Sequence, residues 1–192
     1  MKSALQGHID LFCGDESGVS LLPCVPYGWQ FADERVAMPS QKGGGVNCYA
    51  LISRGDLPRQ SGCREQQCHA HFTEGKVTAA WISERLDALS LSLPRPTVVV
   101  LDNATVHRRA VKDRGYLWQE RGLFVWFLPT YSPHLNIAEV LWRKLKYEWL
   151  RPEDYATLDT LRLAVWTALK AVGNTLNIAF SPFRKCLDGS ST

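Results

Sequence analysis

A short apolar run that ends directly in a carboxylate places the strongest constraint on this chain. Residues 98–101 read Val-Val-Val-Leu, and Asp102 follows them. The run is too short for a helix and rich in β-branched residues, which predicts a strand buried on both faces. Asp102 is therefore expected at the rim of a sheet, where open α/β folds bind their ligands.

A second acid follows further along the chain, with 36 residues between the two. Residues 123–128, Leu-Phe-Val-Trp-Phe-Leu, predict another buried strand, and the Pro-containing residues 129–133 predict a turn. The next helix is expected to carry Glu139 in its first turn. This succession of strand, acid, helix, strand, helix and acid is typical of a metal-dependent nuclease site.

An acidic segment near the N-terminus repeats the first of these settings. Residues 8–14 predict a strand that ends at Asp15-Glu16-Ser17-Gly18. Alone, this segment would indicate a hairpin turn, for which Asp and Gly are usual residues. Together with the downstream acids it favours Asp15 as a first catalytic acid. Glu16 is the second choice, because it could replace Asp15 only with a rearrangement of the backbone.

Three segments resemble the acidic motifs of the Tc–mariner-like bacterial insertion-sequence transposases. The first is Asp-Glu-Ser-Gly at 15–18, followed by Gly28-Trp29; the second is Asp-Asn-Ala-Thr-Val-His at 102–107; the third is 128–139 with Trp142. The resemblance covers residues 9–169. One departure is that Ile137-Ala138 occupies the place where the family usually has Pro after the Asn.

The resemblance implies a catalytic DDE domain with a ribonuclease H-like α/β fold, a mixed five-stranded sheet with helices on both faces. We expect one domain over residues 1–192, with a tail at 174–192. Asp15, Asp102 and Glu139 are the expected catalytic acids and the ligands of two Mg²⁺ or Mn²⁺ ions, since hard cations prefer carboxylate oxygens. Asp15 and Asp102 are expected on adjacent parallel strands. Without metal the clustered carboxylates repel one another, so at least one should have a raised pKa.

Three polar residues are expected to support the acids. Asn103 directly follows Asp102, and His107 is predicted to fix the loop by hydrogen bonding rather than to act as a metal ligand or general base. Asn136 is predicted as the N-cap of the third-motif helix, with the capping-box spacing to Glu139. Glu139 therefore has two alternative roles, as a capping acid or as the i,i+4 partner of Arg143.

Basic residues flank the second and third motifs and predict contacts with DNA phosphates, although a net charge of +3 is only weakly basic. The alternative is a solvated helix face. The expected DNA-binding residues are Arg108, Arg109, Lys112, Arg143, Lys144 and Lys146.

The remaining segments complete the expected fold. Strands are predicted at 19–26, 46–54 and 67–72, the last as a short edge strand, and helices at 79–91, 106–121 and 157–172. A loop-rich passage is expected at 27–45. Cys63, Cys68, His69 and His71 suggest zinc, but their spacing matches no common zinc module, and an exposed polar strand is preferred.

Composition restricts the class of protein. A length of 192 residues, 45% hydrophobic content and seven Trp predict a globular domain. No apolar run is long enough for a membrane span. Six cysteines without regular spacing indicate reduced thiols in the cytoplasm, where a transposase would lie near the nucleoid. The glycines at 43–45 lack the Lys-Ser/Thr of a phosphate-binding loop.

The predicted function is cleavage of phosphodiester bonds at element ends and joining of 3′-OH ends to target DNA. The partners implied are DNA, a second copy of the chain in a DNA complex, and an upstream helix-turn-helix polypeptide, because the chain starts just before its first strand. Two alternatives stay open: a ribonuclease H-like nuclease without strand transfer, and an inactive remnant that binds only DNA or a partner.

Overall fold

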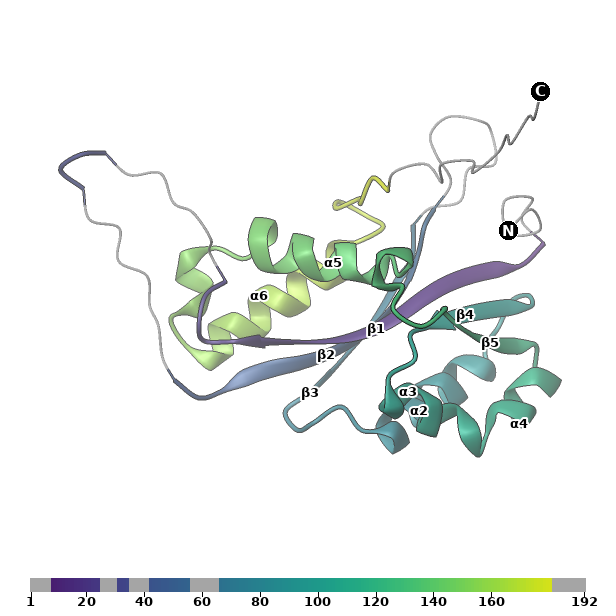
Figure 1. Ribbon diagram of the computed structural model, residues 1–192. Helices are drawn as coiled ribbons and strands as arrows, with labels where there is room; N and C mark the ends of the chain where they lie inside the picture. The colour runs from purple at the N-terminus through teal and green to yellow at the C-terminus, as the bar shows by residue number, and fades with distance from the viewer. Residues whose placement is uncertain (1–7, 25–30, 35–41, 56–65, 181–192) are drawn as a thin grey trace, which may run out of the picture.

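The computed structural model describes residues 8–24, 31–34, 42–55 and 66–180. A five-stranded sheet in the order β3-β2-β1-β4-β5 forms its centre (Figure 1). The β1–β2 and β2–β3 pairs are antiparallel, whereas β1–β4 and β4–β5 are parallel. The strands are β1 (Asp10–Ser20), β2 (Gly45–Ser53), β3 (Cys68–Thr73), β4 (Thr97–Leu101) and β5 (Leu123–Phe127).

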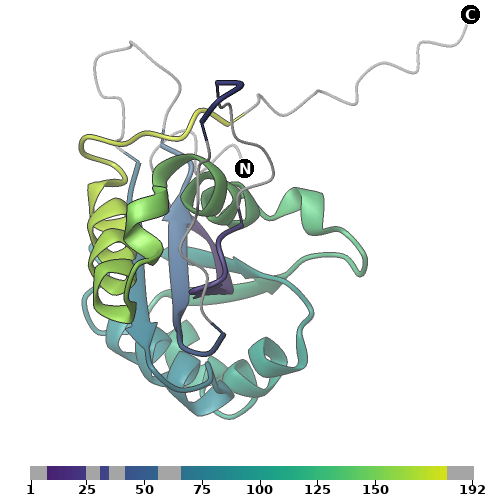
Figure 2. The same ribbon diagram turned by 90° about the vertical axis from the view of Figure 1, so that its left-hand side faces the viewer.

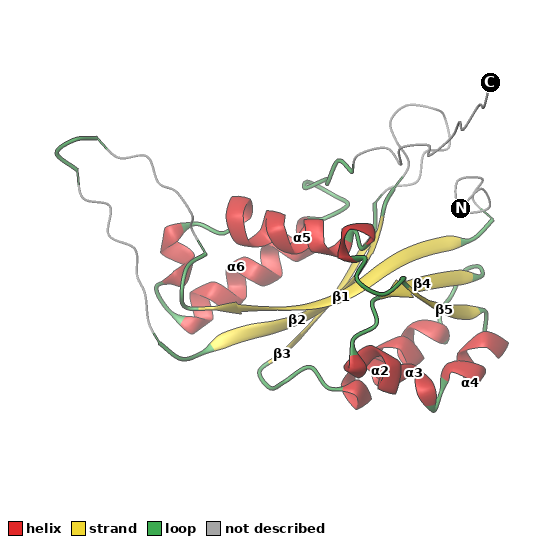
Figure 3. Ribbon diagram, in the orientation of Figure 1, coloured by secondary structure: helices red, strands yellow, loops and turns green. Residues whose placement is uncertain are grey.

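Helices cover both faces of the sheet (Figures 2 and 3). On one face, α5 and α6 pack against β1, β2 and β3; on the other lie α2, α3 and α4. The helices are α2 (Ala79–Ser90), α3 (Thr105–Lys112), α4 (Gly115–Glu120), α5 (Ala138–Lys144) and α6 (Leu158–Ala171), with 3₁₀ turns η1 (Pro133–Leu135) and η3 (Pro152–Tyr155) and a π-helical turn η2 (Leu145–Trp149). The predicted ribonuclease H-like architecture is confirmed.

The residues of β2 divide the core between these two layers. Cys48, Ala50 and Ile52 pack on the α5/α6 side, and Tyr49 and Leu51 on the α2/α3/α4 side, all of them buried. This is the two-residue alternation of a strand between two apolar layers. The central strands are thereby fixed in register from both faces.

Strand β1 is longer than the sequence predicts. It was expected to end before Asp15, but it stays paired with β2 as far as Ser20, which lies opposite Gly45. The expected separate strand at 19–26 is therefore wrong, since Val19 and Ser20 belong to β1. The apolar β2 provides a continuous partner, and β1 can accommodate Asp15 and Glu16 because β4 ends earlier and leaves them at an open edge.

Strand β5 is buried on only one face, which corrects the prediction of a fully buried strand. Leu123 is buried, whereas Phe124 is 39% and Trp126 68% exposed. β5 is the outer strand of the sheet, and the contacts of α5 and α6 fall on the strands at the other end. Its outward residues therefore lack a covering layer.

The helix expected over 106–121 is two helices, α3 and α4, which is a further correction. The break falls at Asp113 and Arg114, directly before Gly115, and Asp and Gly are both poor helix formers. Trp118 of α4 is fully buried, and its Nε1 donates to Asp87 at 3.1 Å. Arg114 also donates to Asp87 and so links the break between α3 and α4 to helix α2.

The other predicted helices are confirmed, and so is the edge position of β3, but its residues are mostly half-buried and not exposed as predicted. Thr78 caps α2 and Thr157 caps α6, each accepting a hydrogen bond from a backbone N–H three residues on. β3 is the outer strand at its end of the sheet. Within the described ranges no helix is long and apolar enough to cross a membrane.

The structure does not support the zinc alternative. Cys68 packs on the α5/α6 core, whereas His69 contacts the ring of Phe12, whose side chain belongs to the opposite face. Cys63 lies outside the described residues, as do Gly28, Trp29, most of the expected loop 27–45 and residues 181–192 of the tail. Among the described residues, no group of three or more His, Cys, Asp or Glu is arranged to hold a metal ion.

Candidate active site

Two aspartates lie side by side at the rim of the sheet, on the adjacent parallel strands where they were expected. The last β1–β4 pair is Cys13 with Val100. Two residues further along each chain come Asp15 and Asp102, so both side chains point to the same face of the sheet. The pairing of parallel strands therefore brings together two acids that are far apart in the sequence.

Asp15 and Glu16 point to opposite faces of β1. Phe12 packs in the α2/α3/α4 core and Val19 in the α5/α6 core. By alternation, Asp15 faces α5 and Glu16 faces α3. Glu16 can therefore not take the place of Asp15 without turning the strand over, which agrees with its second rank in the sequence interpretation.

The Asp15 carboxyl lies in an electrostatically unfavourable place. Burial raises its pKa, the charges of Glu16 and Asp102 raise it further, and the sum brings it to about 7 despite an opposing effect of His107. The expected raised pKa in the acid cluster thus belongs to Asp15. Its Oδ1 atom accepts a hydrogen bond from the backbone N–H of Glu16 at 2.9 Å.

His107 lies between two carboxylates. Its side chain is fully buried, and Nδ1 is 2.5 Å from Asp102 Oδ1. Nε2 is 2.8 Å from Glu16 Oε2, and this second contact is an ion pair without the geometry of a regular hydrogen bond. Burial lowers the pKa of His107, but Glu16 and Asp102 outweigh this and the net shift is upward. His107 thus contacts Asp102, the first residue of the second motif.

Tyr49 is a neighbour of the site that the sequence interpretation missed. It lies opposite Glu16 in the β1–β2 register, and its ring centroid is 6.1 Å from that of His107. Its hydroxyl is buried and has no hydrogen-bond partner among the described residues. Burial raises the pKa of Tyr49, and the nearby acids raise it further. Within an apolar strand, only its pairing with Glu16 would have singled it out.

Asn103 joins the ends of β4 and β5. Its Nδ2 donates to the carbonyl of Leu128, and its Oδ1 accepts from Arg108. The Arg108 guanidinium also lies over the Phe127 ring, 4.5 Å from the centroid. Arg108 therefore contributes to the rim of the site as well as to its charge.

Asn136 connects helix α5 to β1. Its buried Nδ2 donates to the carbonyl of Gly14 at 3.1 Å, and its Oδ1 accepts from the backbone N–H of Ala138. The helix begins one residue later than predicted: Ile137 occupies the cap position, so Asn136 is not the N-cap and forms an Asx-type turn before the helix. This contact positions the start of α5 beside the residue preceding Asp15.

Glu139 lies exposed in the first turn of α5. Its backbone N–H bonds the carbonyl of Asn136 at 3.2 Å. Among the described contacts there is none between its carboxylate and Asp15, Asp102, Asn136 or Arg143. The structure thus brings the two aspartates together with Glu16 and His107, and leaves the Glu139 carboxylate directed to solvent.

The expected DNA-binding residues differ in how they are engaged. Arg109, Lys112 and Arg143 are exposed. Lys144 pairs with Glu148 at 2.5 Å. Lys146 is half-buried near Cys48, and burial raises the pKa of the Cys48 thiol to about 12 against the opposing charge of that lysine.

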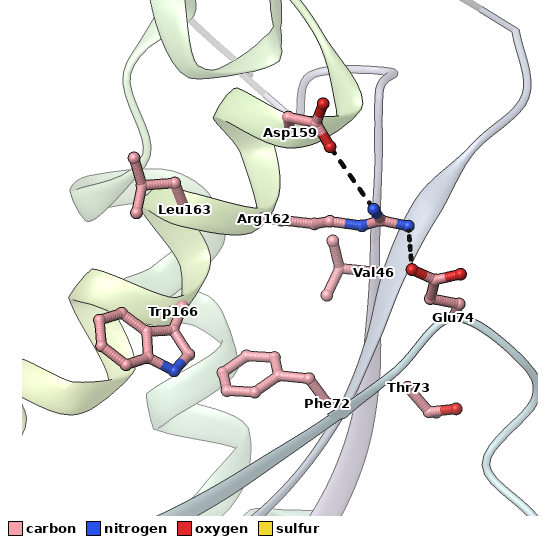
Figure 4. A pocket seen from close by; sticks show the side chains of 8 residues that line it. All are labelled: Val46, Phe72, Thr73, Glu74, Asp159, Arg162, Leu163 and Trp166. Atoms are coloured by element: carbon pink, nitrogen blue, oxygen red, sulfur yellow. Dashed lines mark hydrogen bonds and ion pairs between the residues drawn. The ribbon is translucent and has the colours of Figure 1, made fainter.

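The described hollow with an apolar lining lies away from the acids. It has a volume of about 490 Å³ and is formed by α6 and the β2–β3 edge, with Phe72 and Trp166 on its walls (Figure 4). Arg162 spans it through ion pairs with Glu74 at 2.8 Å and Asp159 at 3.5 Å. None of the acids of the candidate site contributes to it.

The chemistry of the donor set at the sheet rim fits a divalent cation. Asp15 and Asp102 supply carboxylate oxygens, the ligands that Mg²⁺ and Mn²⁺ prefer. Asp102 Oδ1 accepts from the Ala104 N–H at 2.9 Å and contacts His107, whereas no contact of Asp102 Oδ2 is described. A cation would also relieve the repulsion that raises the pKa of Asp15.

Comparison with a solved intasome structure supports the fold. A chain of the simian T-cell lymphotropic virus intasome in complex with the PP2A regulatory subunit B56 gamma matches with a TM-score of 0.51 and 12% identity, over 95% of this chain and 60% of that one. The Mos1 strand transfer complex matches at 0.46 and 17% identity, over 91% and 57%, and the Mos1 mariner paired end complex with Mn at 0.44 and 16%, over 87% and 56%. This chain spans about three fifths of the length of these chains.

Comparison with curated proteins gives no match. The family profile described as DDE superfamily endonuclease matches residues 10–162, a span that includes Asp15, Asp102 and Glu139 and every strand of the sheet. The chain therefore belongs to the DDE superfamily endonucleases.

Proposed function

We propose that this chain is the catalytic domain of a Tc–mariner-like bacterial insertion-sequence transposase, which cleaves DNA at element ends and joins 3′-OH ends to target DNA. The observation that carries the proposal is the parallel β1–β4 pairing, which sets Asp15 beside Asp102 in a chain of the DDE family. The three motifs of the sequence add the subtype.

Glu139 is the proposed third acid. Its helix packs on the face of β1 to which Asp15 points, and Asn136 holds the start of that helix against Gly14. Glu139 follows within one turn, and its exposed side chain can change rotamer without leaving a packed site.

Asp15, Asp102 and Glu139 are the residues that would hold two Mg²⁺ or Mn²⁺ ions. When bound, such ions activate the attacking oxygen and stabilise the leaving oxygen in phosphodiester chemistry. Two of the similar solved structures are Mos1 paired end complexes, one with Mn and one with Mg. The chain's own part is to fix two carboxylates on a rigid sheet, which sets the position of the scissile phosphate.

DNA is the proposed partner. The matched structures include an intasome and a Mos1 paired-end complex with the left transposon end. Exposed Arg109, Lys112 and Arg143 flank the motifs and are suited to phosphates. Arg108, Lys144 and Lys146 have additional contacts within the chain. A homodimer in the DNA complex, a helix-turn-helix polypeptide encoded upstream and a cytoplasmic, nucleoid-associated location complete the proposal.

The product of the reaction tests this function. The chain is incubated with Mn²⁺, a labelled duplex carrying a 3′-OH element end and a target plasmid. Joined strands support the transposase, whereas nicks alone would identify a nuclease without strand transfer. No reaction under conditions of measurable DNA binding would indicate an inactive remnant. Asp102→Asn serves as the control for contaminating nucleases.

Divalent metal is expected to stabilise the folded chain. At 100 times the dissociation constant, Mg²⁺ binding to the native state adds about 2.7 kcal/mol by mass action. This corresponds to a rise in melting temperature of roughly 5–10 °C for a chain of this size. Asp102→Ala should abolish the rise while retaining the fold. An equal rise in the variant would place the ion elsewhere.

DNA binding by the chain is expected to be independent of sequence and steeply dependent on salt, because phosphate contacts release counterions and carry no base information. Changing Arg143, Lys144 and Lys146 together to Ala should weaken binding to every duplex alike. Each lost phosphate contact removes about one unit from the slope of log K against log salt.

The measurement is a binding titration at several salt concentrations, on an element-end duplex and a scrambled one. A matched control is the double change of Lys76 and Lys170 to Ala, two exposed lysines on other elements, which should leave the slope unchanged. A strong preference for the element end would show that the domain reads bases itself.

A further inference from the structure

We propose that His107 and Glu16 are positioning residues: together they hold the Asp102 carboxylate so that one oxygen is bound by the protein and the other is free for the cation. The inference rests on the proposed metal-dependent function and names the part of the chain that presents the ligand. Glu16, although it belongs to the first acidic motif, then serves as an anchor for His107 and not as a ligand.

Both contacts of Asp102 use the same oxygen atom. His107 Nδ1 lies 2.5 Å from Asp102 Oδ1, and the backbone N–H of Ala104 donates to that atom at 2.9 Å. Two donors from different directions fix the plane of the carboxylate, because rotation would break both bonds. No contact of the opposite oxygen, Oδ2, is described, so this oxygen is available to a cation held with Asp15.

The imidazole is held in its turn. His107 is fully buried in α3, and its Nε2 lies 2.8 Å from Glu16 Oε2. Each ring nitrogen therefore faces a carboxylate oxygen, and a 180° flip of the ring would move both nitrogens away from their partners. A histidine between two carboxylates cannot also bind a metal through either nitrogen without giving up one of these contacts.

The contact with His107 also stabilises Glu16. Its Oε2 atom is buried, with no regular hydrogen-bond partner among the described residues. A buried carboxylate oxygen is costly unless it is paired. Tyr49 lies opposite Glu16 in the strand register, and its ring is fully buried.

Two substitutions of His107 separate the two contacts. The amide nitrogen of Asn occupies about the place of Nδ1, and that of Gln about the place of Nε2. We expect His107→Asn to keep the hydrogen bond to Asp102, and His107→Gln to lose it while still reaching Glu16. Loss of an outer-shell partner lowers metal affinity by about 10–100-fold.

The measurement is Mn²⁺ affinity of the full chain without DNA, followed by the paramagnetic resonance signal of the free ion. His107→Gln should bind Mn²⁺ at least about 10-fold more weakly, and His107→Asn within about threefold of the parent. Equal affinities of the two variants would overturn the inference. His71→Gln, a half-buried histidine of the edge strand β3, is the matched control and should bind as the parent does.

Glu16 gives a second test that does not depend on the folding of the His107 variants. Glu16→Ala removes charge and contact together, whereas Glu16→Gln removes the charge and keeps an oxygen that can accept from His107. Positioning predicts a loss of about 10-fold in Mn²⁺ affinity for Ala and recovery of most of it for Gln. Equal losses in both would show that only the charge of Glu16 matters, and would contradict the proposal.

The failure of this inference differs from the failure of the proposed function. Asp15→Asn and Asp102→Asn remove expected ligands, and both should weaken Mn²⁺ binding more than any His107 variant. If neither does, the ion binds elsewhere and the proposed function fails. If both do while His107→Gln binds as the parent, only the positioning role is wrong.

Discussion

Replacing Asp15 with Asn is expected to raise the melting temperature of the metal-free chain at pH 8 and to abolish its metal-dependent DNA cleavage. The carboxyl is half-buried beside Glu16 and Asp102, and desolvation together with these two charges brings its pKa to about 7. At pH 8 the folded chain must therefore hold an ionised group in an unfavourable place. Asn keeps the shape and the acceptor for the Glu16 N–H, but carries no charge.

The sign of the pH dependence follows from proton binding. The unfolded chain loses the Asp15 proton near pH 4, and the folded chain near pH 7. Between these values the folded state binds more protons, so the contribution of Asp15 is fully present below about pH 4 and is lost as pH rises through 7. A shift of this size is worth on the order of 2–4 kcal/mol.

The test compares melting temperatures of parent and Asp15→Asn at pH 5 and pH 8. We expect the variant to exceed the parent by roughly 5–10 °C at pH 8 and by much less at pH 5. Saturating Mg²⁺ should stabilise the parent and not the variant. Asp159→Asn, a change at an exposed carboxylate of α6, is the control and should be nearly neutral at both pH values. Equal melting temperatures of parent and Asp15→Asn at pH 8 would show that Asp15 is not under electrostatic strain.

The sequence predicts those elements whose signal is local. The β-branched run before Asp102 and the periodic apolar faces of α2 and α6 define their own secondary structure, and Thr78 and Thr157 cap the helices. The adjacency of Asp15 and Asp102 was also predictable, because parallel strands of one sheet place their equivalent ends together. The resemblance to a known family added that these two strands are neighbours.

What the sequence did not predict depends on neighbours in space. Strand β1 continues through Asp15 because β2 pairs with it as far as Ser20. The polar residues 15–18 alone would indicate a turn. Strand β5 is apolar throughout, yet Trp126 is exposed because no helix covers that end of the sheet. The break between α3 and α4 follows from the insertion of Trp118 into the core and the attachment of Arg114 to Asp87.

The residues around the acids were also only partly predictable from the sequence. His107 was expected to hold the motif loop, but its second partner, Glu16, lies on another strand and is brought near only by the fold. Tyr49 has no sequence signal other than its place in an apolar strand. The pairing of Glu16 with Tyr49 becomes visible once the β1–β2 register is known.

Gly14, the residue before Asp15, is expected to be one of the positions in the chain least tolerant of a side chain. A Cβ atom there would lie 2.6 Å from Leu101 Cδ2, 2.8 Å from Leu51 Cδ2 and 2.9 Å from the Tyr49 hydroxyl. All three residues are fully or almost fully buried, so none can move without disturbing the core. Overpacking of this kind costs about 1–3 kcal/mol, occasionally more.

We therefore expect Gly14→Ala to lower the melting temperature by roughly 5–10 °C, and Gly14→Val to prevent stable folding. Gly18→Ala is the matched control on the same strand, because a Cβ at this exposed position would meet only the side-chain oxygen of Asn47, at 3.0 Å. It should change stability by less than about 1 kcal/mol. The measurement is the thermal unfolding of the three variants and of the parent.

A Gly14→Ala variant as stable as Gly18→Ala would mean that Leu51 and Leu101 can move aside, and that the core beneath the acids is less tightly packed than its contacts indicate. A strongly destabilised Gly14→Ala variant would show that Asp15 is carried by a strand with no freedom to shift, as the positioning of the two aspartates requires.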